Sequence, residues 1–505
     1  MAIIKIDNLG QFGTIEDTAA SELLANALNA AQNISYRYGN IVPSAGYKIT
    51  YDVNFTGAPI NGILMMRTPD TLTRRVYACT PLRIYKYTSL TTVADITRET
   101  ASVKVPYTGT NFNKWTNFAF NGFAYFNNSV DEPQVYNDVA GTAPVQPLPG
   151  WNSTWRVKSL RAYKNAIIAM NMTEGGVNFP HLLRFSDTAA PGAQPTSWTA
   201  LPTNKAGSVP MAETQGGLVD GLQLGDAFII YKQDSYYRMT FIGGNDVYRI
   251  QKINNCPGLL GQNCVVQYPG GHFCLGANLD VYVHNGGDYK SVLQGRLKER
   301  FKNRTISVGA NKSQYFVAID AERRECLVFF TDSPSGLGCL YAYAWNWEED
   351  TWSERQMPLL LAAGTGQLDA AIVGDADSEF TIMAGVYQQI CVIDGSLPQG
   401  ATTPTRSIQR DGLDFGDKLA VKTVRSFTPN IVGTPGDIFL IGVKSAYEPS
   451  GFVGVVPSYT FTLGTSVEMP VMVTGRFFSY IITTQSVNPW KLRSLQFDVE
   501  MRGRY

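Results

Sequence analysis

Histidine is scarce in this chain of 505 residues and occurs only at His181, His272 and His284. None of the three lies at metal-ligand spacing from another histidine or from a cysteine pair. The seven cysteines form no CxxC pair, and because their number is odd, at least one cannot form a disulfide within the chain. A chain of this length buries a large core without disulfides. The sequence therefore argues against a zinc ribbon and predicts reduced, buried thiols, with no metal site and no cofactor.

Net charge is also absent, since 42 Lys and Arg residues balance 42 Asp and Glu residues. No global field would draw such a chain onto nucleic acid or an anionic membrane, so any contact with DNA must be local. No stretch approaches the roughly 20 apolar residues that a membrane-spanning helix needs. The opening residues, MAIIKIDNLGQFGTIED, contain no long apolar segment. We expect neither a membrane span nor a secretory signal.

The common catalytic motifs are missing as well. The sequence contains no GxxxxGK[ST] phosphate loop, no GxGxxG between a strand and a helix, and no GxSxG nucleophile elbow. The strongest candidate for catalysis is the acidic run Glu348, Glu349 and Asp350, because paired carboxylates can flank a glycosidic bond. Neighbouring side chains on a strand point to opposite faces, however, so this run predicts a polar hairpin turn between Trp347 and Trp352. We expect no enzymatic activity and no catalytic, cofactor-binding or metal-binding residue.

Short apolar runs separated by Gly, Asn, Asp and Pro make up most of the chain, which is typical of strands and turns. From about residue 61 to residue 395 this texture recurs every roughly 40 to 50 residues, the period of four-stranded propeller blades. The units centre on residues 75–97, 115–136, 156–198, 218–253, 271–293, 314–352 and 370–393. Their spacing is loose, so we predict an all-β fold with a β-propeller of about five to seven blades. A pair of β-sandwiches is the structural alternative.

Only two stretches show helical periodicity. In residues 18–33, Leu24, Ala27, Leu28 and Ala31 fall on one face behind Asp17 or Thr18 as the N-cap, which predicts a short helix. In residues 291–303 the apolar positions are also on one stripe, with four bases around the remainder. The bases of this second helix predict a solvated face, with phosphate contact as the alternative.

The texture changes near residue 395, where the segment GSLPQGATTPT is dense in Pro, Gly and Thr and predicts a boundary. The strands that follow alternate inward and outward positions and suit a two-sheet sandwich of about 100 residues. We therefore expect three parts. Residues 1–55 form an N-terminal segment with the helix 18–33 packing on the platform, 56–400 form the propeller, and 401–505 form a C-terminal β-sandwich, the platform.

The stretch from Leu224 to Gly287 is the most specific in the chain. Its elements, in order, are the strand 228–232, Tyr236, Arg238 and Met239, Gly243 and Gly244 before Tyr248 and Arg249, Gly258 and Gly261 before Val265 and Val266, the strand 281–283, and Gly286 with Gly287. This order resembles the propeller of tail nozzle proteins, also called tail tubular or stabilisation proteins, of short-tailed bacteriophages. The segments NISYRYGNIVPSAGY and AYAWNWEEDTWSERQMP and the terminal strands also resemble that family. The turn from Ser186 to Trp198 resembles a family element, with a longer Pro/Gly insertion.

The resemblance implies a structural protein of the virion tail that is assembled in the cytoplasm of the bacterial host. It implies a homohexameric ring below the portal and adaptor complex, enclosing the channel for genome ejection. The implied partners are the adaptor (head-to-tail connector) ring, tail fibres or spikes, and double-stranded DNA that passes without tight sequence-specific binding. The alternative is a carbohydrate-binding or glycosidase propeller of a tail spike or lectin-like protein.

Overall fold

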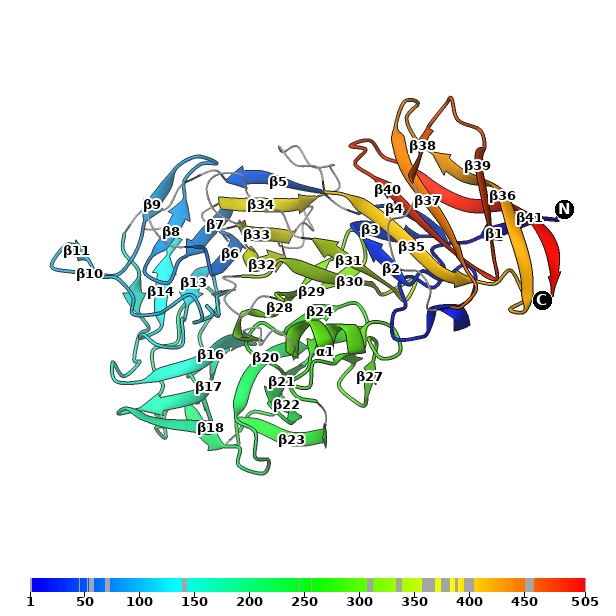
Figure 1. Cartoon of the computed structure of the whole chain (residues 1–505). Helices are drawn as coiled ribbons and strands as arrows, with labels where there is room; N and C mark the ends of the chain where they lie inside the picture. The colour runs from blue at the N-terminus through cyan, green and yellow to red at the C-terminus, as the bar shows by residue number, and fades with distance from the viewer. Residues whose placement is uncertain are drawn as a thin grey trace.

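The computed structural model describes residues 2–44, 46–51, 53, 59–68, 73–138, 143–244, 246–255, 257–306, 312–332, 338–356, 368–373, 382–386, 389–394, 404–449 and 458–504. Nearly all of its regular structure is antiparallel strand, arranged as a propeller with a two-layer platform at one end, where both termini lie (Figure 1). The all-β class predicted from the turn-rich texture is confirmed.

The first three blades are four-stranded sheets in which each strand pairs with the next along the chain. Blade one contains β6 (Gly62–Arg67), β7 (Arg74–Cys79), β8 (Ile84–Tyr87) and β9 (Val93–Asp95). Blade two contains β12 (Phe118–Phe120), β13 (Phe123–Phe126), β14 (Gln134–Asn137) and β15 (Gln146–Pro147). Blade three contains β16 (Arg156–Tyr163), β17 (Ala166–Glu174), β18 (Val177–Phe185) and β19 (Gly207–Pro210). A small hairpin, β10 (Glu99–Thr100) and β11 (Val103–Lys104), lies between blades one and two.

Blades four to six repeat this order. Blade four contains β20 (Leu218–Leu224), β21 (Ala227–Lys232), β22 (Ser235–Phe241) and β23 (Tyr248–Asn255). Blade five contains β24 (Val265–Tyr268), β25 (Gly271–Leu275), β26 (Val281–His284) and β27 (Tyr289–Ser291). Blade six contains β28 (Phe316–Asp320), β29 (Glu325–Phe330), β30 (Tyr341–Asn346) and β31 (Thr351–Gln356).

Blade seven joins distant parts of the chain. It contains β32 (Leu368–Val373), β33 (Ile382–Val386) and β34 (Gln389–Asp394), and its fourth strand is β5 (Gly46–Tyr51), which pairs antiparallel with β34. The first strands of the seven sheets contact one another in a closed cycle, with β32 against β6. The described residues thus form a seven-bladed propeller, within the predicted range. The ring of blades is closed by β5, a strand from the predicted N-terminal segment, which forms backbone hydrogen bonds with β34 at the other end of the propeller sequence.

The platform is a sandwich of two sheets. One layer contains β1 (Ala2–Asp7), β3 (Ile34–Arg37), β4 (Asn40–Pro43), β36 (Ala420–Val432), β39 (Met469–Gly475) and β41 (Lys491–Arg504). The other contains β2 (Ala30–Gln32), β35 (Arg406–Leu413), β37 (Ile438–Ala446), β38 (Ser458–Thr462) and β40 (Phe477–Thr484). Buried apolar side chains from both layers form one core between them. Packing of two alternating sheets on a shared apolar layer is the arrangement that the C-terminal strand pattern predicts.

The platform and the propeller share a sheet. Strand β2 pairs parallel with β31 at the outer edge of blade six, and antiparallel with β35 of the platform. The result is one nine-stranded sheet that runs from blade six into the platform. The predicted linker gave no sign of this continuity, and its residues 395–403 lie outside the described residues.

The helix predicted over residues 18–33 is wrong. This segment contains only the short 3-10 helix η1 (Ala20–Glu22), and then strand β2. Leu24, expected on the buried stripe, is 61% exposed, whereas Leu28 is fully buried. Tertiary pairing explains the difference, since Ala30–Gln32 gains backbone partners from both β31 and β35, which a helix would forgo.

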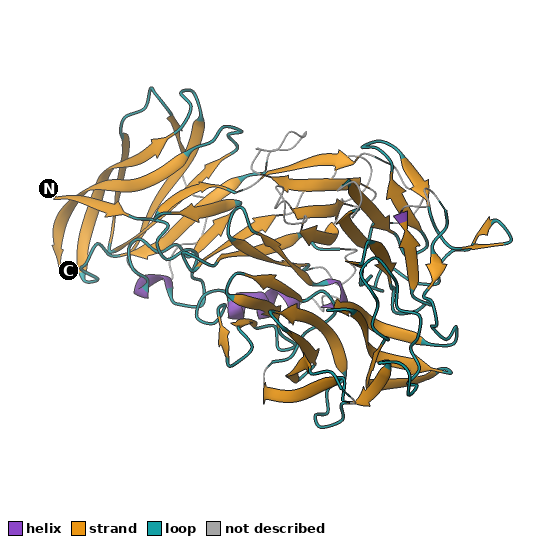
Figure 2. Ribbon diagram, turned by 180° about the vertical axis from the view of Figure 1, so that it is seen from behind, coloured by secondary structure: helices purple, strands orange, loops and turns teal. Residues whose placement is uncertain are grey.

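The second predicted helix exists but is displaced. Helix α1 runs Lys298–Ile306, while Ser291 ends strand β27. The predicted apolar stripe is buried, with Leu293, Leu297 and Phe301 at 0–1% exposure. The described residues contain little helix beyond α1 and the short 3-10 helices η1 and η3 (Lys312–Gln314), as the view from behind in Figure 2 shows. Gly243 and Gly244 lie between β22 and β23, and both have positive φ (71° and 79°), a conformation that glycine adopts readily in hairpin connections.

Candidate functional site

The acidic run considered for glycosidic chemistry forms the β30–β31 hairpin turn, as the sequence predicted. Each of the three carboxylates has a different partner within the chain. Glu348 pairs with Arg324, Glu349 accepts a hydrogen bond from the backbone N–H of Tyr38 (2.8 Å), and Asp350 accepts one from Trp345 Nε1 (2.9 Å). No two of them face each other across a described cavity, so this turn lacks the geometry of a carboxylate pair.

The tryptophans of the same hairpin pack between blades. Trp345 stacks on Phe273 of blade five, with ring centroids 5.7 Å apart, and Trp347 lies 5.9 Å from Tyr268. The turn from Ser186 to Trp198 is also satisfied internally. The Ser186 hydroxyl accepts the Ile167 N–H (2.9 Å), and Trp198 is buried against Trp151. These aromatic side chains therefore serve packing between and beneath blades.

Among the described residues, no group of three or more His, Cys, Asp and Glu side chains could hold a metal ion. The six described cysteines are buried free thiols, as predicted, and Cys256 lies outside the described residues. His272 and His284, which no spacing in the sequence connected, face the same tyrosine between blades four and five. No described helix is long and apolar enough to cross a membrane.

The axis of the propeller is bridged by side chains at one level. Lys114, which precedes blade two, donates to the backbone carbonyl of Gln314, which precedes blade six (2.6 Å). Asn263, which precedes blade five, donates to the carbonyl of Trp115 (3.0 Å). In the ring of seven blades, blade two is a neighbour of neither blade five nor blade six, so these two hydrogen bonds cross the central axis. At this level the propeller is filled by its own chain.

A buried ion pair anchors this axial cluster. Asp220 on β20 is fully buried and binds the Arg161 guanidinium of blade three (2.6 Å) and the backbone N–H of Asn263, just before blade five (2.9 Å). Burial alone would raise the pKa of Asp220, but Arg161 and the hydrogen bonds of Ser159 and Asn263 outweigh it and hold the pKa below its usual range. The carboxylate therefore stays charged and ties three blades together.

A second set of ion pairs lies at the seam between the platform and blade six. Glu325 of β29 pairs with Arg355 of β31 and with Arg37 of platform strand β3 (3.1 Å to Arg37). Glu16 of the N-terminal segment pairs with Arg300 of α1, and Arg300 also pairs with Glu354 of β31 (2.9 Å). Lys298 and Arg304 of α1 also pair within the chain, with Asp280 (2.7 Å) and Glu354 (2.9 Å). Lys302 instead pairs with the exposed Glu299 (3.5 Å), so the predicted solvated face holds for part of the helix, and no observation supports the phosphate alternative.

Asp17 links the seam to α1 in an unexpected way. Its carboxylate accepts the backbone N–H groups of Lys298 (2.8 Å) and Glu299 (3.2 Å), so it caps the N-terminus of α1 from 281 positions away in sequence. The N-cap signal in the sequence is real, but the helix that it caps is not the one that follows it. The sequence carried one sign of these buried ion pairs, because the charged Glu325 begins the apolar run ECLVFF.

The platform carries much of the exposed apolar surface. Of 23 large apolar side chains that are exposed among the described residues, 12 lie on the platform, which contributes fewer than a third of the chain. They are Ile3, Leu24, Tyr38, Leu419, Val432, Ile438, Leu440, Tyr447, Val467, Met472, Val487 and Met501. Contiguous exposed apolar surface is typical of sites that contact other proteins, and Ile438 and Leu440, two positions apart on β37, share one face of that strand.

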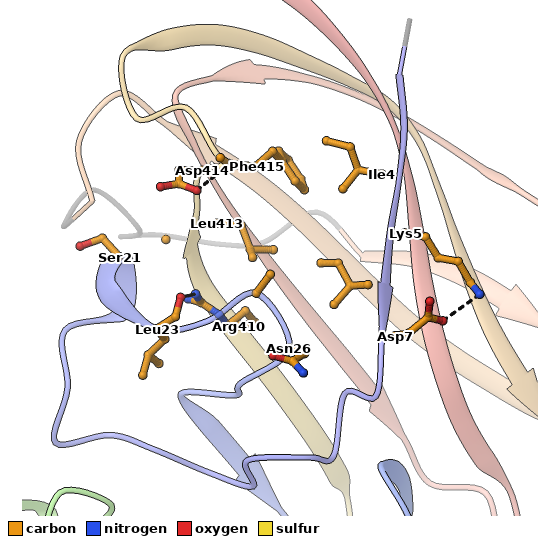
Figure 3. Close-up of a pocket in the computed structure, with 14 residues that line it drawn as sticks. Ile4, Lys5, Asp7, Ser21, Leu23, Asn26, Arg410, Leu413, Asp414 and Phe415 are labelled. Carbon is orange, nitrogen blue, oxygen red and sulfur yellow. Dashed lines mark hydrogen bonds and ion pairs between the residues drawn. The ribbon is translucent and has the colours of Figure 1, made fainter.

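A pocket of about 320 Å³ opens on the platform between strand β1, the loop around η1 and the β35–β36 turn (Figure 3). Lys5 and Asp7 form an ion pair on one side (2.8 Å). Arg410, which is fully buried, donates to the backbone carbonyls of Ala20 (2.6 Å) and Leu23 (2.8 Å). The arginine thereby holds the η1 loop against the sandwich, and it is one of the residues that line the pocket.

No protein-family model matches the chain, and no curated protein matches it. Solved structures with similar folds include the computationally designed Ika8 protein (8% identity, covering 72% of this chain and 96% of that chain, TM-score 0.40). They also include an inactive virginiamycin B lyase from Staphylococcus aureus (11%, 69% and 99%, TM-score 0.40). A third is the WD40 β-propeller domain of Doa1 (10%, 70% and 98%, TM-score 0.37). These similarities carry no inference about activity.

Proposed function

We propose that this protein is a structural component of the tail nozzle of a short-tailed bacteriophage and has no enzymatic role. In this proposal six copies form a ring below the portal and adaptor, and the genome leaves through the lumen of the ring. The tail fibres or spikes attach to the same assembly. The proposal starts from the sequence resemblance in residues 224–287 and at both ends of the chain.

The observation that carries it is the concentration of exposed apolar side chains on the platform. A ring needs surfaces that bury apolar area between copies, and the exposed apolar side chains of the two-layer platform support this role. The bridged axis adds a geometric condition. Because Lys114 and Asn263 cross the centre of the propeller, DNA would have to pass between copies and not through a single propeller.

The proposal is tested by electron microscopy and mass measurement of the purified full chain, alone and with the portal and adaptor of the same phage. We expect rings with six copies and a central hole. A chain that remains monomeric under both conditions would contradict the proposal. Cleavage of host polysaccharide by the purified protein would favour the glycosidase alternative.

A matched pair of variants locates the assembly surface. Ile438→Lys changes an apolar side chain on platform strand β37 that is 53% exposed, and Val177→Lys changes one on blade three that is 57% exposed. We expect the platform variant to reduce ring formation at least tenfold and the blade variant to assemble normally. The reverse result would move the assembly role to the blades.

A further inference from the structure

The hydroxyl of Tyr231 lies between two histidines at the boundary of blades four and five. Tyr231 belongs to β21 of blade four, whereas His272 and His284 belong to β25 and β26 of blade five. The hydroxyl oxygen is 2.7 Å from His272 Nδ1 and 2.6 Å from His284 Nε2. All three side chains are at least 97% buried. The cluster therefore links two blades through hydrogen bonds that are shielded from water.

The outer partners of the two imidazoles determine where each proton lies. His284 Nδ1 accepts the backbone N–H of Gly286 (3.1 Å), so the proton of a neutral His284 is on Nε2 and is donated to Tyr231. His272 Nε2 lies 2.9 Å from the backbone carbonyl of Gln223, so it donates there, and its Nδ1 accepts the Tyr231 hydroxyl proton. The chain of donors runs from His284 through Tyr231 and His272 to Gln223. Every ring nitrogen has a partner only while both histidines are neutral.

The groups that face the cluster are uncharged. The Tyr236 ring stacks on His284 (centroids 4.6 Å apart), the Tyr282 ring lies 6.2 Å away, and the Cys274 thiol is 3.6 Å from the Tyr231 hydroxyl. The ammonium of Lys232, next to Tyr231 in sequence, donates instead to backbone carbonyls of residues 211 and 214. Asp288 and Lys290, which follow β26, are exposed. No described carboxylate is paired with either imidazole, so no negative charge would stabilise a protonated ring.

A proton added to His284 would sit on Nδ1 and face the Gly286 N–H, which places two donors against each other. A proton added to His272 would sit on Nδ1 and face the Tyr231 hydroxyl proton, so the hydroxyl could no longer donate to that nitrogen. Either event breaks the donor chain between the blades. Burial lowers the pKa of His272 to about 4 and, together with His272, that of His284 to about 3, in agreement with the geometry.

We propose that Tyr231, His272 and His284 form an acid-sensitive latch, which holds blade four against blade five at neutral pH and releases this boundary when the histidines are protonated. Release exposes the side chains of the boundary, including Cys274. The latch acts through the stability of one blade boundary, and it is independent of the assembly role proposed above.

The direction with pH follows from proton linkage. In the open boundary the histidines regain an ordinary pKa near 6.5, whereas in the closed boundary both pKa values are lower. The closed state is therefore favoured fully above about pH 6.5 and loses stability as the pH falls below that value. Between pH 7 and pH 5, each histidine increases the open population about 20-fold.

The test measures how fast a thiol reagent that works in mild acid labels each cysteine. The protection of a cysteine is its labelling rate in the unfolded protein divided by its rate in the folded protein at the same pH. Labelled peptides are quantified by mass spectrometry. Protection of Cys274 should fall at least 20-fold between pH 7 and pH 5, while protection is retained for Cys79 in blade one and for Cys339 in blade six, between β29 and β30. Equal loss at all three cysteines would mean general unfolding and would overturn the latch, as would unchanged protection of Cys274.

Variants assign the effect to the histidines. In a His272→Gln and His284→Gln double variant, which cannot titrate in this range, we expect Cys274 to keep its protection between pH 7 and pH 5. His181→Gln in blade three is the matched control and should behave as the wild type. A loss of Cys274 protection that persists in the double variant would contradict the proposal. If that variant does not fold, the comparison of the three cysteines in the wild type decides the question.

Discussion

The buried carboxylate of Glu325 offers the sharpest test of how the platform is attached to the propeller. Its side chain is 3% exposed and pairs with Arg355, which is 4% exposed, and with Arg37 of the platform. Glu325→Gln keeps the shape of the side chain but leaves Arg355 buried without a carboxylate. Removing one partner of such a pair destabilises a protein by about 3–5 kcal/mol. With an unfolding entropy of about 2.1 cal/mol/K per residue, the midpoint of a chain of 505 residues should fall by about 3–5 °C.

The matched control is Asp7→Asn, which breaks the Lys5–Asp7 pair on the platform surface. Both side chains of that pair are more than half exposed, so the loss should stay below about 1 kcal/mol and the midpoint should shift by less than about 1 °C. Thermal unfolding can be followed by tryptophan fluorescence, because Trp345 and Trp352 lie in blade six beside the seam.

The pH dependence gives a second check on Glu325. Burial raises its pKa, but Arg355 and Arg37 outweigh burial, so the pKa in the folded protein is below the ordinary 4.5. The carboxylate then stabilises the fold above pH 4.5, and this contribution is lost as the pH falls through the lowered pKa. The difference between wild type and Glu325→Gln should shrink in acid. If the variant melts within about 1 °C of Asp7→Asn at neutral pH, the reasoning about the seam is refuted.

Two further substitutions test local features. Gly258→Ala should destabilise the protein by about 3 kcal/mol or more, because Gly258 has φ +61° and a Cβ there would overlap the backbone carbonyl of Gln233; Gly225→Ala, at φ +56° with open space around it, should lose only about 1 kcal/mol. Equal midpoints for the two glycine variants in urea unfolding would show that the overlap is relieved. Asp17→Ala should remove the cap of α1, lower stability by about 1 kcal/mol and speed hydrogen exchange of the first amides of α1, and unchanged exchange there would argue against the cap.

The ring of blades could be predicted from sequence because it depends on local patterns. Each unit contains its own short apolar runs and turn residues, and neighbouring strands of a blade are joined by tight turns such as Gly225–Asp226 between β20 and β21. All seven predicted units correspond to the seven sheets. The buried thiols and the hairpin turn at Glu348–Asp350 follow from the same local rules, since apolar context and turn chemistry act over a few residues.

The attachments between these units depend on contacts that span hundreds of residues, and only the tertiary structure decided them. Strand β5 completes blade seven, β2 joins blade six to the platform, and Asp17 caps a helix that begins at Lys298. The helical periodicity of residues 18–33 does not produce a helix because backbone hydrogen bonds of β2 to the two strands β31 and β35 are worth more than the weak propensity of a short isolated helix. The histidine pair on Tyr231 has the same origin. Sequence spacing reveals only which residues are close along the chain. The packing of blades determines which buried polar groups come into hydrogen-bonding contact.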